Sequence, residues 1–118
     1  MKYFNYTEFD SPDVQGSGQL MDETLLQMLD EVREKFDKPI HITSGYRTAA
    51  HNEAVGGTEN SSHLRGLAVD ISCKNSKDRF DLINCLLDVG FNRIGIAKTF
   101  IHADIDRDKV QGVIWLYA

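Results

Sequence analysis

Residues 61–70 read Ser-Ser-His-Leu-Arg-Gly-Leu-Ala-Val-Asp, a turn followed by an apolar run that ends on a charge. The run is typical of a buried strand. A buried carboxylate is costly unless it is paired or bound to a cation. Asp70 therefore requires either a metal ion, for which His63 would be a second ligand, or an ion pair with Arg65 or Arg93.

A third ligand of the same kind lies downstream. Residues 100–104 read Phe-Ile-His-Ala-Asp and place His102 in another apolar run. A catalytic zinc usually keeps three protein ligands from His, Asp and Glu, with water in the fourth position. His63, Asp70 and His102 supply such a set, although His63 taken alone fits a surface loop histidine better than a ligand.

Length and composition place few limits on the function. The chain has 118 residues, which fits one domain, residues 1–118, with 42% hydrophobic and 26% charged residues. Its net charge of -5 argues against nucleic acid or an anionic membrane as the main partner. No segment approaches the roughly 18 apolar residues of a membrane span, and the first residues lack a signal-peptide pattern. We therefore expect synthesis in the cytoplasm.

Two longer helices, one short helix and several short strands account for most of the chain. The predicted elements are a helix from its cap Asp22 to Phe36, a strand over 40–43, a short helix over 48–55, a strand over 67–72, a helix over 76–89, and strands over 91–96, 100–105 and 113–117. The last strands follow one another, which predicts an α+β fold with a mainly antiparallel sheet. A hairpin is expected across 97–99.

The helix over 76–89 is predicted to be capped by Ser76. Its inward residues are expected to be Phe80, Ile83, Leu86 and Leu87, which recur at helical spacing. The two cysteines, Cys73 and Cys85, do not form a disulfide framework or a zinc pattern and are interpreted as structural thiols.

Arg47 follows Ser44-Gly45-Tyr46 where the first strand ends, a position at which loops often carry function. A guanidinium group can hold a carboxylate in two parallel hydrogen bonds. The alternative is an ordinary surface arginine. His51 lies close by in sequence and is a candidate for a substrate contact, whereas His41 is interpreted as structural.

Several motifs now occur in an order that is similar to a known family. They are Ser44-Gly45-Tyr46-Arg47, Asn52, Gly56-Gly57, Ser61-x-His63-x-x-Gly66-x-Ala68-x-Asp70, Arg93-Ile94-Gly95-Ile96 and Phe100-Ile101-His102-x-Asp104. Together they resemble the M15 zinc peptidases, the group of D-Ala-D-Ala carboxypeptidases and phage endolysins, and most of all the small branch of that family that is often found in phage and prophage.

The resemblance implies a hedgehog/DD-peptidase-like α+β fold and a zinc ion on His63, Asp70 and His102. It implies that Arg47 binds the substrate and helps to stabilise the oxyanion, and that Ser61 lies at the substrate. The implied substrate is the stem peptide of peptidoglycan, cleaved next to a D-amino acid. A monomer of phage or prophage origin, delivered to the cell wall, is expected.

The general base is the part of this pattern that the sequence leaves open. Many relatives carry an acid or a histidine three residues before the last ligand, where this chain has Thr99. Asp104 lies two residues after His102, on the same side of a strand, and is the candidate base. Its alternative role is to orient His102 or Arg47, and Glu53 or Glu59 would then be the base.

Two functions follow. The first is a zinc metallopeptidase, a carboxypeptidase or an endopeptidase, in which Asp104 and Arg47 are catalytic. The second is a peptidase-like module that keeps zinc but has lost turnover and serves in wall binding or as a phage structural module. A third interpretation, in which Asp70 is only salt-bridged and no metal binds, also remains open at this point.

Overall fold

Helices and strands alternate through the first part of the chain, and three strands follow one another at its end. The computed structural model describes residues 1–118. In chain order the elements are η1 (Tyr6–Phe9), η2 (Ser17–Leu20), α1 (Glu23–Phe36), β1 (Ile42–Ser44), α2 (Ala49–Ala54), η3 (Ser62–Arg65), β2 (Ala68–Ser72), α3 (Ser76–Val89), β3 (Arg93–Ile96), β4 (Phe100–Asp104) and β5 (Val113–Leu116), where η marks a 3-10 helix. None of the helices combines the length and the apolar character needed to cross a bilayer.

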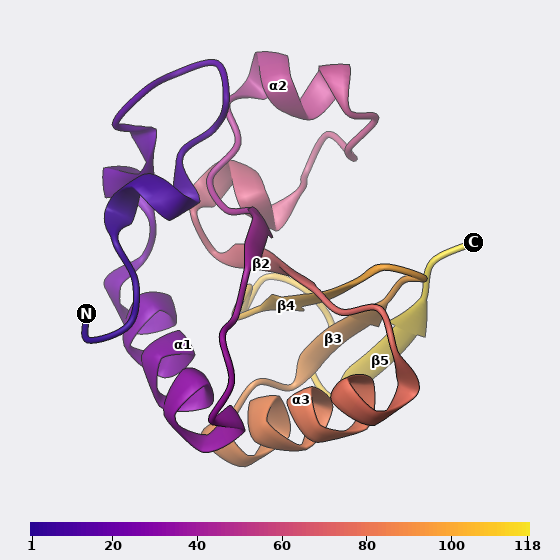
Figure 1. Ribbon diagram of the computed structural model, residues 1–118. Coiled ribbons are helices and arrows are strands. Elements are labelled where there is room, and N and C mark those ends of the chain that lie inside the picture. Colours follow the sequence, from indigo (N-terminus) through magenta and orange to yellow (C-terminus); the bar gives the residue numbers. More distant parts are fainter.

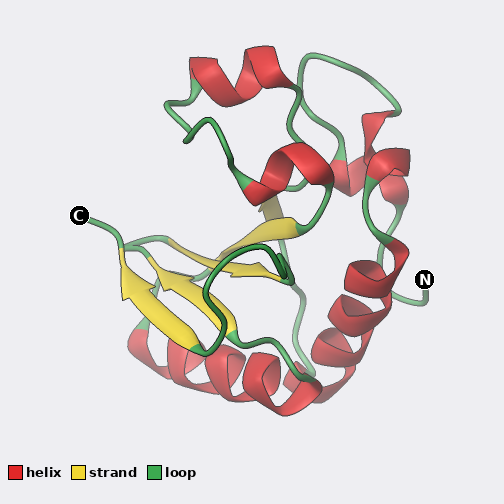
Figure 2. Ribbon diagram, turned by 180° about the vertical axis from the view of Figure 1, so that it is seen from behind, coloured by secondary structure: helices red, strands yellow, loops and turns green.

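The five strands form one sheet in the order β1-β2-β4-β3-β5. The strand pairs β1 with β2, β2 with β4, and β4 with β3 are antiparallel, and the last of these is the expected hairpin. The edge strand β5 pairs with β3 in parallel. Figures 1 and 2 show α1 and α3 together against the sheet, with α2 far from both. The α+β fold with a mainly antiparallel sheet is therefore confirmed.

Alternate residues of the central strands point to opposite sides of the sheet, as the pleat requires. One side, which we call the core face, packs with α1 and α3 in a single apolar cluster. Its strand residues are Val69, Ile71, Ile94, Ile101 and Ala103, all fully or almost fully buried. The residues between them form the opposite side, which we call the site face.

The first helix begins and ends where the sequence predicts. The Asp22 carboxylate accepts a hydrogen bond from the Leu25 backbone N at 3.0 Å, and Asp37 ends the helix in a left-handed conformation. The buried residues Leu25, Leu26, Leu29 and Val32 form its inner side. The Asp22 backbone N also donates to the Gly66 carbonyl at 3.0 Å, which joins the start of α1 to the turn before β2.

The inner side of α3 was predicted correctly at Ile83 and Leu86 but wrongly at Phe80 and Leu87. Phe80 is 66% exposed and Leu87 is 46% exposed, whereas Leu82 and Leu86 are buried. Both sets recur at helical spacing, so periodicity alone does not choose between them. The cap is Asn75 rather than Ser76, since the Asn75 side chain accepts a hydrogen bond from the Asp78 backbone N.

The first residues of the chain support the site from one side. Phe4 and Phe9 are buried and pack edge to face, with ring centroids 5.7 Å apart. The Phe9 carbonyl accepts a hydrogen bond from the Tyr46 backbone N at 2.9 Å. This contact fixes the loop that follows β1, and that loop carries Gly45 and Arg47.

Candidate metal centre

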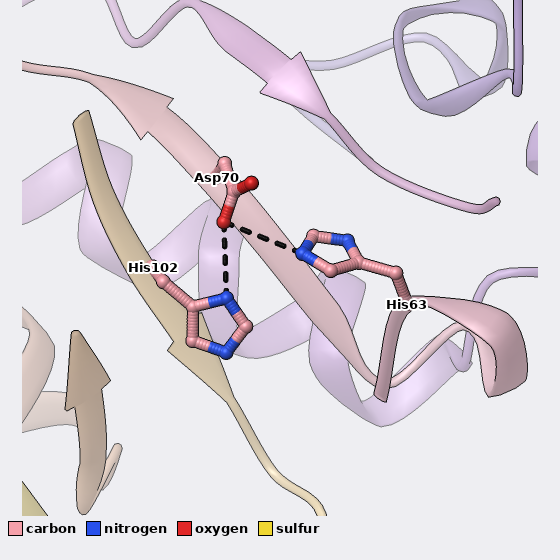
Figure 3. A group of neighbouring side chains, drawn as sticks. All are labelled: His63, Asp70 and His102. Carbon is pink, nitrogen blue, oxygen red and sulfur yellow. Dashed lines mark hydrogen bonds and ion pairs between the residues drawn. The ribbon is translucent and has the colours of Figure 1, made fainter. Parts of the chain in front are cut away.

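Three buried side chains from separate elements meet on the site face. His63 comes from η3, Asp70 from β2 and His102 from β4, and Figure 3 shows both imidazole rings turned toward the Asp70 carboxylate. Asp70 and His102 are direct cross-strand partners in the antiparallel ladder. One nitrogen or oxygen atom from each of the three residues lies within 4.8 Å of those of the others.

Local structure fixes His63 in this group. Ser61 caps η3, and its hydroxyl oxygen accepts a hydrogen bond from the His63 backbone N at 3.3 Å. Gly66 ends the turn with φ +69°, a conformation that favours glycine. A side chain at Gly66 would also meet the Leu20 carbonyl, so the turn needs glycine for two reasons.

The acceptors beside the outer nitrogens indicate which tautomer each neutral histidine adopts. The His63 Nδ1–H donates to the Gly45 carbonyl at 2.8 Å, and the His102 Nε2–H donates to an Asp104 oxygen at 2.7 Å. Their lone-pair nitrogens, His63 Nε2 and His102 Nδ1, face the same Asp70 oxygen at 3.3 and 3.0 Å. Lone pairs that converge in this way repel one another unless a cation or protons lie between them.

The donor set fits a zinc ion. Two neutral imidazole nitrogens and one carboxylate oxygen are the ligand types of catalytic zinc, and each histidine has an acceptor on its other nitrogen, as zinc-ligating histidines usually do. A divalent cation at this point would remove the lone-pair repulsion and balance the charge of Asp70. The structure thus brings together all three residues that the sequence singled out as ligands.

The same contacts shift the pKa values of two members of the group. Burial alone would raise the pKa of Asp70. When the inner nitrogens of His102 and His63 carry protons instead of a cation, their hydrogen bonds outweigh this effect and hold that pKa far below its usual value. Burial would lower the pKa of His102, but the carboxylates of Asp104 and Asp70 reverse the effect and raise it. The group therefore favours the ionised form of Asp70 and has a strong affinity for positive charge.

Arg47 lies beside this group and is held by three neighbours. Its Nη2 is 3.3 Å from the second Asp70 oxygen, its Nε donates to the Ser44 hydroxyl at 3.0 Å, and its Nη1 donates to the Asn52 side chain at 3.2 Å. Its side chain is only 14% exposed. Arg47 is therefore not an ordinary surface arginine.

The ion pair considered for Asp70 is formed by a different arginine from those expected. Arg47 pairs with Asp70, whereas Arg93 pairs with Asp104 at 2.7 Å and Arg65 pairs with Asp106. Arg47 contacts Asp70 Oδ2, whereas both histidines face Asp70 Oδ1. Asp70 Oδ1 therefore has no arginine partner. An ion pair alone does not explain why two imidazoles converge on that oxygen.

The structure places Asp104 behind His102, on the side away from Asp70. One of its oxygens accepts the hydrogen bond from His102 Nε2, and the other accepts from Arg93 Nε at 2.7 Å and the Asp106 backbone N at 3.0 Å. Asp104 is 1% exposed. Both oxygens are thus occupied, and this geometry favours the orienting role over the role of a general base.

Asp106 follows β4 in a polar stretch of the sequence, yet it is fully buried. Its carboxylate accepts hydrogen bonds from the Ser62 hydroxyl at 2.5 Å and from Arg65. These contacts tie η3, which carries His63, to the end of β4, which carries His102. The only signal in the sequence was the repeated Asp-x-Asp of residues 104–106.

A cleft of about 450 Å³ opens over the three candidate ligands. Arg47 and Ser61 line it, as expected, and so do three aromatic residues that the sequence did not single out, Phe100, Trp115 and Tyr117. Glu53, Glu59 and His51 are not among the lining residues. The two alternative candidates for the general base and the histidine considered for a substrate contact therefore lie outside this cleft.

Comparison with known families gives one match. The sequence model of the family described as Peptidase M15 matches residues 2–104, which is most of the chain and includes all three candidate ligands. A search of curated proteins found no match.

Proposed function

We propose, because the chain belongs to the peptidase M15 family, that it is a zinc-dependent peptidase that hydrolyses peptide bonds next to D-amino acids in peptidoglycan. One observation carries the proposal. Two imidazole nitrogens converge on one oxygen of the buried Asp70, and all three residues line an open cleft. That arrangement suits a divalent cation with one position open to substrate.

His63 Nε2, Asp70 and His102 Nδ1 would hold the zinc ion. Zinc bound there would act as a Lewis acid that polarises a peptide carbonyl and activates water. The protein's part is to keep both histidines in the correct tautomer. The Gly45 carbonyl does this for His63, and Asp104 does it for His102.

Arg47 would bind the substrate on the β1 side of the zinc. Its guanidinium group lines the cleft, and Ser44, Asn52 and Asp70 hold it in place. A guanidinium group held in this way can donate hydrogen bonds to the terminal carboxylate of a peptide or stabilise the negative charge that develops on a carbonyl oxygen. Ser61, at the start of η3, would contribute a hydroxyl to the same wall.

We assign Asp104 to the positioning of His102 rather than to proton transfer. Its charge strengthens the hydrogen bond from His102 Nε2, and Arg93 keeps it ionised in a buried position. Burial would raise the pKa of Asp104, but the hydrogen bond from His102 and the one from the Asp106 backbone lower it. A carboxylate with a depressed pKa and no free oxygen is a poor proton acceptor.

The test combines metal analysis with digestion of the wall polymer. Purified protein should contain about one zinc per chain and should release new amines from purified peptidoglycan. A chelator should abolish the release, and added zinc should restore it. His63→Ala should lose both zinc and activity, whereas His41→Ala, which changes an exposed histidine outside the cleft, should keep both. Protein without stoichiometric metal or without amine release would refute the proposal.

A second function is favoured by one observation. The cleft is lined by two carboxylates, Asp70 and Asp104, and all of their oxygens have partners, while Thr99 lies exposed in the turn between β3 and β4. A zinc-containing module that binds peptidoglycan without cleaving it would need no proton acceptor. Zinc-loaded protein that sediments with peptidoglycan but releases no amines would support this function over hydrolysis.

A further inference from the structure

Three aromatic side chains form one wall of the cleft, on the side of β5. Phe100 and Tyr117 have ring centroids 5.2 Å apart, and Trp115 lies 6.4 Å from Tyr117. The Trp115 ring is also 5.4 Å from the ring of His102. We call Phe100, Trp115 and Tyr117 the aromatic ledge. It begins directly beside a candidate metal ligand.

The sheet makes room for the ledge at Gly95. Gly95 is paired with His102 on one side and with Trp115 on the other, so the three form one row across the strands. A Cβ at Gly95 would lie 2.7 Å from ring atoms of both Trp115 and Tyr117. Both rings therefore approach the backbone of Gly95, in the same row as His102, at a position where any other residue would push them away.

The order of groups along this row defines the axis of the cleft. Asp70 on β2 lies next to His102 on β4, followed by Gly95 on β3 and Trp115 on β5. Arg47 contacts Asp70 from the β1 end. The candidate metal site is thus flanked by a cation on one side and by the ledge on the other, so an extended peptide can cross the strands and touch both.

The charges beside the ledge indicate what it can bind. The Arg93 guanidinium carbon lies 5.0 Å from the Trp115 ring and already occupies its cation-binding face, and Lys109 lines the same cleft. The face of the Trp115 ring that Arg93 covers is therefore not available to the cationic group of a substrate. Tyr117 is 43% exposed and Trp115 is partly exposed, so the ledge retains open apolar surface. An aliphatic side chain gains most from covering it.

We infer, on the basis of the proposed function, that the aromatic ledge is the subsite for the residue on the acyl side of the cleaved bond and that it selects an aliphatic side chain. Arg47 then binds the leaving side, including a terminal carboxylate. The substrate runs from the ledge, over the zinc ligands, to Arg47. This direction makes Arg47 the group that distinguishes a carboxypeptidase from an endopeptidase.

The chain provides its own reporter for this subsite, because Trp115 is the only tryptophan. The probes are three peptides, acetyl-X-D-Ala with X as D-norleucine, D-lysine or glycine, in which X lies on the acyl side of the bond to be cleaved. They are titrated into zinc-loaded protein while Trp115 emission is followed. Norleucine and lysine have the same aliphatic stem and differ in the terminal ammonium group. We expect the norleucine peptide to bind about tenfold more tightly than the glycine peptide, with lysine between them.

Substitutions at the end of β5 and directly after it distinguish the contribution of the ledge from that of the rest of the site. Tyr117→Ala should reduce the preference for norleucine over glycine to less than about threefold, and Tyr117→Phe should retain it. Leu116→Ala changes a 77% exposed residue that points away from the ledge, and it should behave as wild type. Unchanged Trp115 emission in each ligand-free variant would verify that the strand is intact.

The outcomes distinguish this inference from the proposed function. If the wild type hydrolyses peptides but binds the norleucine and glycine peptides equally, or binds the lysine peptide most tightly, the ledge assignment is wrong and the peptidase remains. If it binds norleucine preferentially but hydrolyses neither these peptides nor peptidoglycan, the ledge stands as a binding surface for aliphatic side chains and the peptidase proposal fails.

Discussion

The two faces of the sheet are built from the same strands and differ in every second residue. On the core face, Ile101 and Ala103 are fully buried among apolar neighbours. On the site face, His102 and Asp104 are almost as well buried but take part in a network of charges and hydrogen bonds. Burial therefore has a different cause on each side of β4.

This difference suggests that the core face stabilises the fold and the site face positions the functional side chains. Apolar burial on the core face supplies free energy of folding. The buried charges of the site face contribute less to stability, because their mutual attraction is offset by the loss of hydration, but they hold side chains in fixed positions. Substitutions on the two faces should therefore have separable effects, one on unfolding and the other on metal binding and activity.

The largest effect is expected on the site face at Asp70. Asp70→Asn removes the charge on which both histidine nitrogens converge, so zinc affinity should fall by more than about 100-fold. This loss exceeds the roughly 10- to 100-fold loss that is typical when a residue that only hydrogen-bonds to a metal ligand is replaced. Amine release from peptidoglycan should disappear. Competition with a chelator of known affinity measures the loss, and circular dichroism should show a folded protein. Wild-type zinc affinity in the variant would refute the ligand assignment.

The counterpart on the core face is Ile101, next to His102 in sequence. Ile101→Ala leaves a cavity in the apolar cluster and should lower the free energy of unfolding by about 3 kcal/mol. Urea unfolding measures this change. The folded fraction should still bind one zinc per chain, since the removed atoms lie on the other side of the sheet. Lost zinc with unchanged stability would contradict the division between the faces.

A smaller effect is expected at Asp104, where the substitution to Asn keeps an acceptor for His102 but removes the charge. Zinc affinity should fall by about 10- to 100-fold, as for other outer partners of ligands. If Asp104 were the general base, zinc would stay bound with normal affinity while turnover collapsed. Measuring the zinc affinity and the rate at saturating zinc for the same sample distinguishes the two roles.

The smallest effect is expected at Asp106, and it depends on pH. Burial would raise the pKa of Asp106, but the Ser62 hydroxyl, the Asp108 backbone and Arg65 lower it. A folded pKa below the unfolded value of about 3.9 means that the contribution to stability is present above that pH and is lost as the pH falls through the folded pKa.

Asp106→Asn should therefore destabilise the protein by about 1.5 kcal/mol at pH 7, the range of a hydrogen bond to a charged group. The difference from wild type should shrink at pH 3, which urea titrations at the two pH values would show. Asp108→Asn, which changes a side chain that is 80% exposed, is the matched control and should have little effect at either pH. A difference that grows on acidification would contradict the assignment.

The sequence predicted the elements and the candidate ligands because both depend on local signals. The cap at Asp22, the apolar runs and the spacing of His63 and Asp70 are visible without knowledge of the partners of each strand. The inner side of α3 was predictable in this way only at Ile83 and Leu86, since Phe80 and Leu82 fit helical spacing equally well. Only the position of the sheet decides that Leu82 is buried.

The aromatic ledge was missed for a related reason. Trp115 reaches His102 because β5 pairs with β3 in parallel and Gly95 leaves room between them. Neither the strand order nor the register can be read from residues 113–117. Asp104 was correctly placed on the same side of the strand as His102, but its partners, Arg93 and the Asp106 backbone, became evident only from the fold.

The most direct test of the account is a crystal structure of the zinc-loaded protein with anomalous data collected at the zinc edge. We predict one strong anomalous peak about 2.0–2.1 Å from His63 Nε2, His102 Nδ1 and one Asp70 oxygen, with Asp104 still bonded to His102 Nε2. A peak on Asp104, a peak elsewhere in the molecule, or no peak in active protein would contradict the central claim that these three residues form the zinc site.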